Sequence, residues 1–562
     1  MTIPWGAWKP DVSDYNGDHT QRAENVFPRG DGYGPVPDLA AFTQALPAAC
    51  RGAFLALNTD GTIAIFAGTA TKLYKMSNTD LSWDDVTRAS GGDYAVPAAN
   101  QWQFAQLGSV VVAVNGADAV QAYTLGSSTD FAALAGSPPI AAYVTVVNEF
   151  VVLSGLSSNP FRIQWSARSN AAGWTSGTDE SDFQDFTDGG VVRGVAGGEF
   201  GLVFHDNAMR NMIYQPGSAV VFSFDRIAEG KGLRAPYSLV KAGERIFFKS
   251  ASGFEMVVPG GQPTPIGKER FDRAIDADLD TGAMHLLVGA YEPQSSRVYW
   301  TYKSTTGTSG LFDRIVVWDY VLERGALITG VSGEYITSLG TPGVTLEGLD
   351  SIAPGSQTVS GAADNGSGLV RLTVGSTSGW TTGDIKAVSG VTGTTEANGN
   401  WTITVIDGTN IDLQGSTFAN VYVSGGTVGG SLDAMAVTLD DIPASFATRL
   451  AVVSSSHKVG FLSGAYLEAT LETAEMAGGR RVCVNAVRPD TDAATVYSSL
   501  VTRNKLADLP STSNEAAMDA NGFAFHRTDA RMVKYRNRIP AGTQWTFSIG
   551  VEPAVTVTTG WR

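Results

Sequence analysis

Acidic side chains occur in pairs that could support general acid–base chemistry. Asp182 and Asp185 stand three positions apart, and Asp84 and Asp85 are adjacent. A glycosidase needs two such carboxyl groups flanking a glycosidic bond. Both pairs fall in loop-like sequence, however, where Asp residues most often form solvated turns. Because no complete Asp-box, G-x-S-x-G elbow or Cys–His motif accompanies them, we predict no catalytic residues and a chain that is not an enzyme.

Metal ligands and cofactor motifs are not indicated either. Cys50 and Cys483 lie far apart, and the five histidines have no ligand spacing between them. This pattern favours neither a zinc site nor a disulfide framework. The glycine turns GGEFG (197–201) and VPGGQP (258–263) lack the helix and the Lys-Ser/Thr pair of a phosphate-binding loop. We therefore predict no bound metal and no cofactor.

The densest group of basic residues lies near the C-terminus. If this stretch is a strand, the alternation of side chains places Lys534, Arg536 and Arg538 on one face. Two interpretations stay open: a solvated strand face, or an interface with an acidic neighbour or with nucleic acid. Five basic residues fall within twelve positions, namely Arg527, Arg531, Lys534, Arg536 and Arg538.

The composition indicates an acidic, glycine-rich globular β protein. Hydrophobic residues make up 43%, charged residues only 17%, and the net charge is −16. This excludes a disordered tail, a coiled coil and a collagen-like fibre. Residues 431–562 contain 13 basic and 13 acidic residues, so the whole negative balance lies before them. Such a chain does not hold nucleic acid by its phosphates, and its short apolar runs predict neither a signal peptide nor a membrane span.

Short strands between turns dominate residues 51–350. Hydrophobic strand pairs recur at a spacing of roughly 40–50 residues, which is the period of a propeller blade. Turn signals such as Asp60-Gly61 and Val147-Asn148 indicate hairpins within these pairs. The sequence therefore predicts an all-β fold with a β-propeller over 51–350, six blades being the favoured count and seven the alternative.

Three further segments have a different texture. Residues 1–50 predict an irregular N-terminal arm that contributes to a platform, with helical spacing around 38–46. Residues 357–430 are rich in Gly, Ser, Thr and Val and predict a small β-barrel of five or six strands. Its flanks at 346–350 and 431–441 look continuous with each other, so we interpret the barrel as an insertion. Residues 431–562 predict a C-terminal β platform domain.

Motifs in a fixed order carry a resemblance to a known family. They begin with a Trp165-Ser166 pair and an Asp188-Gly189-Gly190 turn, and they continue through GLRAPYSLV (232–240) and PIGKER (265–270). The C-terminal stretch YRNRIPAGTQWTFSIGV (535–551) follows the same pattern. Over residues 50–350 and 431–562 the chain resembles the tail nozzle, or head-completion (packaged DNA stabilisation), proteins of short-tailed bacteriophages.

The inserted segment carries a separate resemblance. Residues 384–415 resemble a small β-barrel similar to the first catalytic-cysteine half-domain of ubiquitin-activating enzymes. This likeness concerns the fold and implies no ubiquitin chemistry.

The nozzle resemblance implies a structural virion protein made in the host cytoplasm. It implies a propeller beside a platform built from the N-terminal arm and the C-terminal part. Six copies would form a ring below the portal and its adaptor, retaining the packaged genome and then releasing it through a lumen that does not recognise DNA sequence. The implied partners are the adaptor or head-completion ring proteins, with tail fibres or a needle as further contacts. The interface with the adaptor ring would then be formed by the basic residues Arg527, Arg531, Lys534, Arg536 and Arg538. Trp165, Trp174 and Trp318 would then be blade-packing residues.

Two other classes of function remain open at this point. One is a carbohydrate-binding tail or receptor-binding protein, because propellers and small barrels both suit glycans. The other is a propeller glycoside hydrolase.

Overall fold

The structure, a computed structural model, describes residues 2–15, 17–59, 61–78, 80–341, 356–377, 380–430 and 447–557. Nearly all of its regular structure is β-strand, as the sequence predicts. The described exceptions are one short helix, α1 (Asp272–Asp278), and the 3-10 turns η1 (Pro236–Ser238), η2 (Thr281–Leu286) and η3 (Thr395–Ala397).

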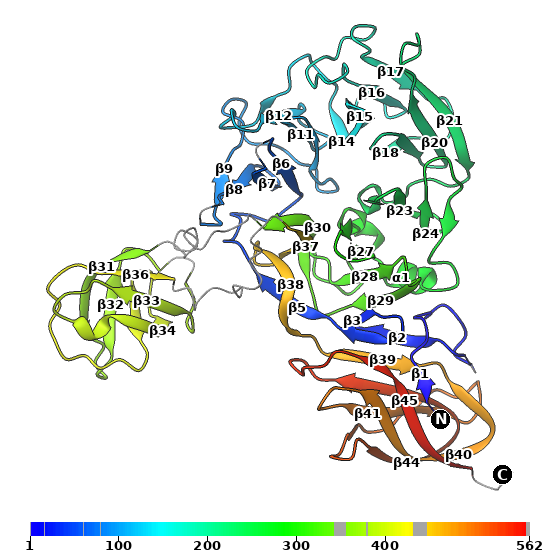
Figure 1. Ribbon diagram of the computed structural model, residues 1–562, viewed down its shortest axis with the longest axis vertical. Coiled ribbons are helices and arrows are strands. Elements are labelled where there is room, and N and C mark those ends of the chain that lie inside the picture. The colour runs from blue at the N-terminus through cyan, green and yellow to red at the C-terminus, as the bar shows by residue number, and fades with distance from the viewer. Residues whose placement is uncertain are drawn as a thin grey trace.

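Five consecutive blades form most of a β-propeller (Figure 1). Each is a four-stranded antiparallel sheet of neighbouring strands. Blades 1 to 3 are β6–β9 (Ala53–Leu57, Ile63–Gly68, Leu73–Met76, Trp83–Asp85), β10–β13 (Gln103–Leu107, Val110–Val114, Gln121–Thr124, Ala132–Ala133) and β14–β17 (Ala141–Val147, Phe150–Leu156, Arg162–Trp165, Asp182–Asp185). Blades 4 and 5 are β18–β21 (Val192–Ala196, Gly201–His205, Ala208–Tyr214, Phe222–Glu229) and β22–β25 (Val240–Ala242, Arg245–Ser250, Gly253–Val257, Thr264–Pro265).

Two further four-stranded units complete the ring. The closing blade joins three later strands to an N-terminal one, in the order β30 (Gly333–Thr341), β37 (Ala447–Ser454), β38 (Val459–Tyr466) and β5 (Pro37–Ala41). The shared blade consists of β26 (Gly289–Glu292), β27 (Arg297–Tyr302), β28 (Arg314–Asp319) and β29 (Arg324–Ile328), and it is one end of a larger sheet. Its first strand packs between β22 and β30, and β30 packs beside β6.

The prediction of a β-propeller is therefore confirmed. Blades 1 to 5 and the closing blade are six separate four-stranded sheets, the favoured count. If the shared blade, which merges with the platform sheet, is also counted, the number of blades is seven, the alternative. The hairpin expected at Val147-Asn148 forms one residue later: Asn148 and Glu149 both have positive φ (42° and 65°) in the tight turn between β14 and β15, whereas Asp60 of the other expected turn lies outside the described residues.

Hydrophobic clusters between neighbouring blades hold the ring together. Blades 1 and 2 share a cluster around Phe66 and Trp102, and blades 3 and 4 share one around Phe150 and Phe222. These side chains are almost completely buried, which is where aromatic residues contribute most to stability.

The large sheet continues from the shared blade into the platform. It contains 15 strands and runs β26-β27-β28-β29-β2-β39-β44-β40-β45-β4-β3. Its N-terminal strands are β1 (Ile3–Pro4), β2 (Thr20–Glu24), β3 (Val26–Pro28) and β4 (Tyr33–Pro35). Its C-terminal strands are β39 (Ala469–Thr473), β40 (Met476–Thr491), β41 (Tyr497–Arg503), β42 (Ser511–Thr512), β43 (Ala516–Ala517), β44 (Ala524–Ile539) and β45 (Ser548–Val557).

Three boundaries differ from the sequence-based expectation. The arm at 1–50 is not irregular, because β1 to β4 pair within the platform sheet and β5 pairs with β38. The stretch 38–46, expected to be helical, begins with strand β5 because β38 offers it a hydrogen-bonding edge. Residues 447–466, assigned to the platform, instead form two strands of the closing blade.

The arm also joins the platform to the propeller. The Trp8 ring stacks on Phe271 at 5.5 Å, next to the start of α1. The carboxylate of Asp11 accepts backbone N–H groups of Arg273 and Ala274, both at 2.8 Å. Because Phe271, at the N-cap position, makes no side-chain cap bond, Asp11 supplies the missing acceptor and caps the helix from a distant part of the chain.

The segment at 357–430 forms a closed barrel in the order β31-β32-β35-β34-β33-β36. Its strands are β31 (Gln357–Asp364), β32 (Val370–Val374), β33 (Ile385–Ser389), β34 (Gly399–Val405), β35 (Asn410–Leu413) and β36 (Thr427–Gly430). The barrel follows β30 and precedes β37, and Thr341 and Ala447 at the ends of those strands are direct cross-strand partners. The flanks 346–350 and 431–441, on which the insertion was inferred, lie outside the described residues.

Candidate functional site: the basic strand of the platform

All five basic residues singled out in the sequence lie on β44, one of the two longest strands of the platform. Lys534, Arg536 and Arg538 share one face of this strand, as the alternation predicts. Their side chains contact carboxylates of the same chain, whereas the sequence suggested either a solvated strand face or an interface with an acidic neighbour or with nucleic acid.

The middle of the strand is an internal ion-pair network. Lys534 is 8% exposed, its ammonium group contacts the Asp14 carboxylate of the arm, and it lies 3.5 Å from Glu472. The Arg536 guanidinium lies 2.6 Å from the other oxygen of Glu472. Glu472 is 5% exposed, so its charge is held almost entirely by these two cations.

Arg538 extends the network toward the hairpin of β41. Its guanidinium pairs with Glu515 at 2.6 Å and with Glu468 at 2.8 Å, and it lies over the Tyr497 ring at 4.5 Å. These hydrogen bonds, Glu515 first, raise the pKa of Arg538, and the same Arg538 bond lowers the pKa of Glu515.

The charges alternate across neighbouring strands. Arg22 on β2 is the cross-strand partner of Glu472 on β39 and pairs with Glu24 at 2.6 Å. Arg503 at the end of β41 holds Glu475 through two bonds of 2.7 Å each. The network therefore ties together strands from both ends of the chain.

This arrangement corrects the sequence-based interpretation of the basic stretch. All three are paired with carboxylates of the same chain: Lys534 is buried, whereas the side chains of Arg536 and Arg538 are 28% and 25% exposed. They are therefore not a set of free, solvated cations. Among the paired acids, Glu472 lies on β39, which pairs with β44, and Glu468 stands just before it, whereas Asp14 and Glu515 come from other segments. What the sequence could not provide is the pairing of two strands so far apart along the chain.

The far end of β44 remains accessible. Arg527 is exposed and Arg531 is half-buried, and Arg480 on neighbouring β40 is exposed. In the part of the chain that the structure describes, none of these three forms an ion pair, whereas the adjacent Asp529 pairs with Arg481 at 3.0 Å. Phe525, 65% exposed, stands beside them. We call Arg480, Phe525, Arg527 and Arg531 the basic tip; Arg480 and Phe525 were missed because they are not part of the dense basic run.

The carboxylate pairs considered for catalysis have local partners instead. Asp185 is held by Arg162 through bonds of 2.6 and 2.7 Å, and the Arg162 bond is the main cause of its lowered pKa. Asp182 accepts the Ser176 hydroxyl. Asp85 pairs with Lys72 at 2.7 Å, and Asp84 is exposed beside it. These contacts give the acids turn-stabilising and strand-pairing roles.

The three tryptophans assigned to blade packing are buried, as predicted. Trp165, Trp174 and Trp318 are 3%, 5% and 2% exposed. The indole N–H groups of Trp165 and Trp174 each donate to a backbone carbonyl, of Glu180 and Ala171 respectively.

The centre of the propeller is filled at one end. The Tyr237 hydroxyl, just before blade 5, accepts the backbone N–H of Gln101, just before blade 2, at 2.9 Å. The Gln101 side chain donates to the His285 carbonyl, and the Tyr143 ring of blade 3 contacts the Tyr237 ring at 6.0 Å. Because these contacts join blades that are not neighbours, they cross the centre of the propeller at this end.

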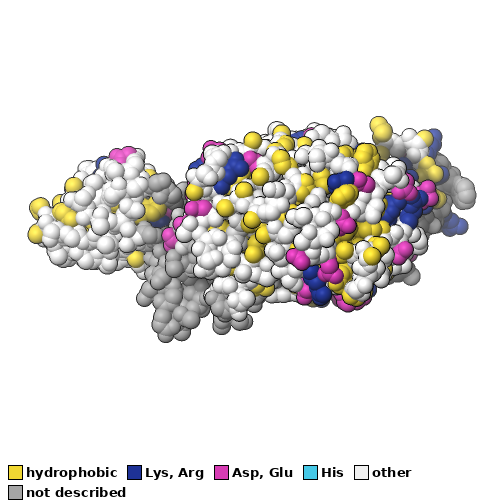
Figure 2. Space-filling view, turned by 90° about the horizontal axis from the view of Figure 1, so that it is seen from above, with side chains coloured by type: hydrophobic (Ala, Val, Ile, Leu, Met, Phe, Trp, Pro, Cys, Tyr) yellow, Lys and Arg dark blue, Asp and Glu magenta, His cyan; other side chains and the backbone are white. Residues whose placement is uncertain are grey.

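No metal-binding cluster of three or more His, Cys, Asp or Glu side chains occurs among the described residues. None of the helices described is long and apolar enough to cross a membrane. On the face seen from above in Figure 2, basic and acidic side chains lie close together in small groups, and uncharged atoms cover most of the surface.

No known protein family matches this chain, and no curated protein matches it. Several solved structures resemble parts of it. One is a functionally unknown protein from Desulfotomaculum acetoxidans (10% identity, TM-score 0.31, 50% of this chain and 89% of that one). Others are YCF48 bound to D1 peptide (12%, 0.32, 52% and 86%) and BamB from Moraxella catarrhalis (11%, 0.27, 69% and 97%). The fold described above is defined by the strand pairing of this chain alone.

Proposed function

We propose that this protein is a structural virion component: the tail nozzle of a short-tailed bacteriophage. Six copies form the DNA exit channel below the portal and its adaptor, and the ring helps to retain and later to release the packaged genome. The chain is made in the host cytoplasm and acts in the virion tail.

The observation that carries the proposal is the composition of the platform sheet. Strand β45 pairs with β1 and β4, and β39 pairs with β2, so the N-terminal arm and the C-terminal part build one platform. The nozzle resemblance implies a platform of this composition beside a propeller, which is why the pairing supports the proposal. A free-standing propeller would need no such second sheet.

Electrostatics support a conduit that DNA slides through. The net charge is −16 per chain, and six copies of −16 total −96. Three of the five most clustered basic residues are neutralised inside the platform, which leaves fewer free cations to hold phosphates. A wall of this kind repels DNA and does not retain it by contact.

The filled propeller centre supports a lumen between copies. The Tyr237–Gln101 hydrogen bond crosses the centre of each propeller, so we place the DNA path along the common axis of a ring and not through a propeller. The basic tip would then be free to meet an acidic surface of the adaptor, with tail fibres or a needle as other contacts of the ring.

Assembly is the test. We expect mass photometry of the protein mixed with a purified portal–adaptor complex to show binding of about 354 kDa, six times 59.0 kDa, and negative-stain images to show six-fold rings. A chain that stays monomeric or trimeric with the complex present contradicts the proposal. Retention on host polysaccharide or release of reducing sugar would instead favour the glycan-binding or hydrolase classes.

A further inference from the structure

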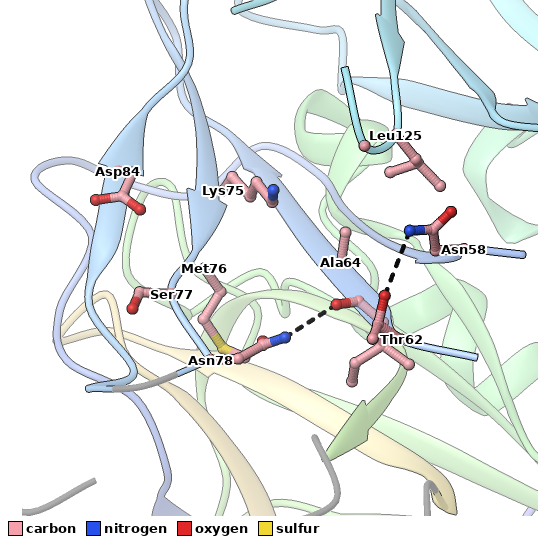
Figure 3. A pocket seen from close by; sticks show the side chains of 11 residues that line it. Asn58, Thr62, Ala64, Lys75, Met76, Ser77, Asn78, Asp84 and Leu125 are labelled. Carbon is pink, nitrogen blue, oxygen red and sulfur yellow. Dashed lines mark hydrogen bonds between the residues drawn. The ribbon is translucent and has the colours of Figure 1, made fainter. Parts of the chain in front are cut away.

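Blade 1 contains an open cavity of about 330 Å³ (Figure 3). It lies where the β6–β7 and β8–β9 turns of blade 1 meet the end of β12 in blade 2. Its apolar wall includes Ile63, Ala64 and Met76 from blade 1 and Leu125 from blade 2. The volume is at the lower end of the range for small-molecule pockets.

A single ammonium group distinguishes this cavity from an ordinary surface hollow. Lys75 on β8 is half-buried, and Figure 3 shows its side chain extending toward Ala64 and Leu125. The hydroxyl of buried Tyr123 lies 3.4 Å from its Nζ atom, and the Tyr123 ring centre lies 5.5 Å away. In the described part of the chain Lys75 takes part in no ion pair, although Asp84 is its cross-strand partner.

Lys72, just before the same strand, shows the contrast. Lys72 pairs with Asp85 at 2.7 Å on the surface. Lys75 has a nearby carboxylate in register but holds its charge within the cavity instead. When a half-buried cation has no counter-ion in the protein, an anionic ligand can supply one and form a charge-assisted hydrogen bond with it.

Neutral polar groups surround the amine. The Asn78 side-chain amide donates to the Ile63 carbonyl at 3.1 Å, and the Asn58 amide donates to the Thr62 hydroxyl at 3.4 Å. These bonds orient amide and hydroxyl groups at the rim, and the Asp84 carboxylate adds an acceptor. Amide, hydroxyl and carboxylate groups are therefore present beside an apolar wall, a combination that suits a polyhydroxylated ligand.

We propose that this cavity binds a sugar acid, such as a uronic acid residue. Its carboxylate would pair with Lys75, its hydroxyls with Asn58, Asn78 and Asp84, and its carbon face would contact Met76 and Leu125. A neutral sugar would leave the Lys75 ammonium group without a counter-ion. An acidic peptide would make few hydrogen bonds with the amide and hydroxyl groups at the rim. This inference does not depend on the nozzle proposal.

The test is a titration of the full chain by calorimetry and saturation-transfer NMR. The probes are glucuronate, glucose and a triglutamate peptide. We expect glucuronate to bind at least about tenfold more tightly than glucose, because only glucuronate can form a charge-assisted hydrogen bond with Lys75. Lys75→Met should weaken glucuronate binding about tenfold, whereas the matched Lys72→Met should leave it unchanged. Raising the salt to about 0.5 M should weaken binding to the wild-type protein.

Three results would overturn the proposal. They are no glucuronate binding up to about 20 mM, unchanged binding by Lys75→Met or at high salt, and tighter binding of triglutamate than of glucuronate. The last would assign the cavity to an acidic peptide. The salt dependence uses the wild-type chain, so it decides the question even if a variant fails to fold.

Discussion

In the propeller, blades 1 to 5 and the shared blade are each built from four consecutive strands, whereas the platform places strands from both ends of the chain side by side. The blades are joined by apolar clusters around residues such as Phe66 and Trp102. The platform adds an ion-pair network in which the arm residue Asp14 meets Lys534. Apart from the closing blade, which joins β5 to β30, β37 and β38, the propeller is therefore specified locally. The platform depends on contacts between distant segments that must be present together.

Loss of Glu472 should break the platform most strongly. Glu472→Ala leaves buried Lys534 and half-buried Arg536 without their shared carboxylate. We expect the free energy of unfolding to fall by about 1.5–3 kcal/mol, because Arg536 loses its charged hydrogen-bond partner whereas Lys534 keeps Asp14. Denaturant unfolding followed by tryptophan fluorescence measures it.

A matched change in the propeller provides the control. Asp85→Ala removes a pair whose side chains are 37% and 43% exposed, so it should cost less than about 1 kcal/mol. Equal losses in the two variants would remove the distinction between the two regions.

The seam between the regions should respond to pH. Burial is the main reason that the pKa of Asp272, the first residue of α1, is raised to about 6. The folded state therefore keeps a proton that the unfolded state loses, and stability falls as the pH rises from about 4 to about 6. Asp272→Asn removes this cost, so we expect it to be more stable than wild type at pH 8, by on the order of 3 kcal/mol, with little difference at pH 4.

Thermal unfolding of both proteins across this pH range measures the effect. A constant difference between variant and wild type at every pH would show that the Asp272 carboxyl does not titrate in this window.

Excision of the barrel should leave both regions intact. Because Thr341 and Ala447 are cross-strand partners, a four-residue Gly-Ser turn can replace residues 342–446. We expect the remaining chain to stay folded and to be stabilised by at most about 3 kcal/mol, because closing a four-residue turn costs less entropy than closing the 105-residue connection it replaces. Insoluble protein, or loss of the propeller transition in calorimetry, would show that the barrel is part of the folding unit.

The smallest effect on stability should come from the basic tip. Arg527→Glu with Arg531→Glu should change the free energy of unfolding by no more than about 0.5 kcal/mol, because neither residue has an ion-pair partner to lose among the described residues. The same variant should weaken docking to an acidic adaptor surface. Its comparison is Arg536→Glu with Arg538→Glu, which places new carboxylates against Glu472 and Glu468 and should destabilise the platform. Similar melting temperatures for the two double variants would contradict this division of β44.

The propeller and the barrel were predictable because their information is local. Strand pairs recur at regular spacing, hairpin turns such as Asn148-Glu149 follow directly from the chain, and the barrel has its own composition. Strand β5 was misread because its apolar spacing suits a helix equally well, and only β38 supplies the edge that selects a strand.

The ion-pair network could not be predicted in the same way. Lys534 and Arg536 look like free charges until Glu472 and Asp14 are placed beside them, and those acids lie in other segments of the sequence. Charge alternation in two strands suggests such a pairing. Which charges lie opposite each other, however, depends on the register, and the register is set by the whole sheet.

The measurement that tests the central claim most directly is a cryo-electron microscopy reconstruction of the protein bound to its portal–adaptor complex. We predict six copies around an open lumen, with the axis of each propeller, whose centre the Tyr237–Gln101 hydrogen bond crosses, displaced from the symmetry axis. A reconstruction with another symmetry, or with a propeller centred on the channel axis, would contradict the account.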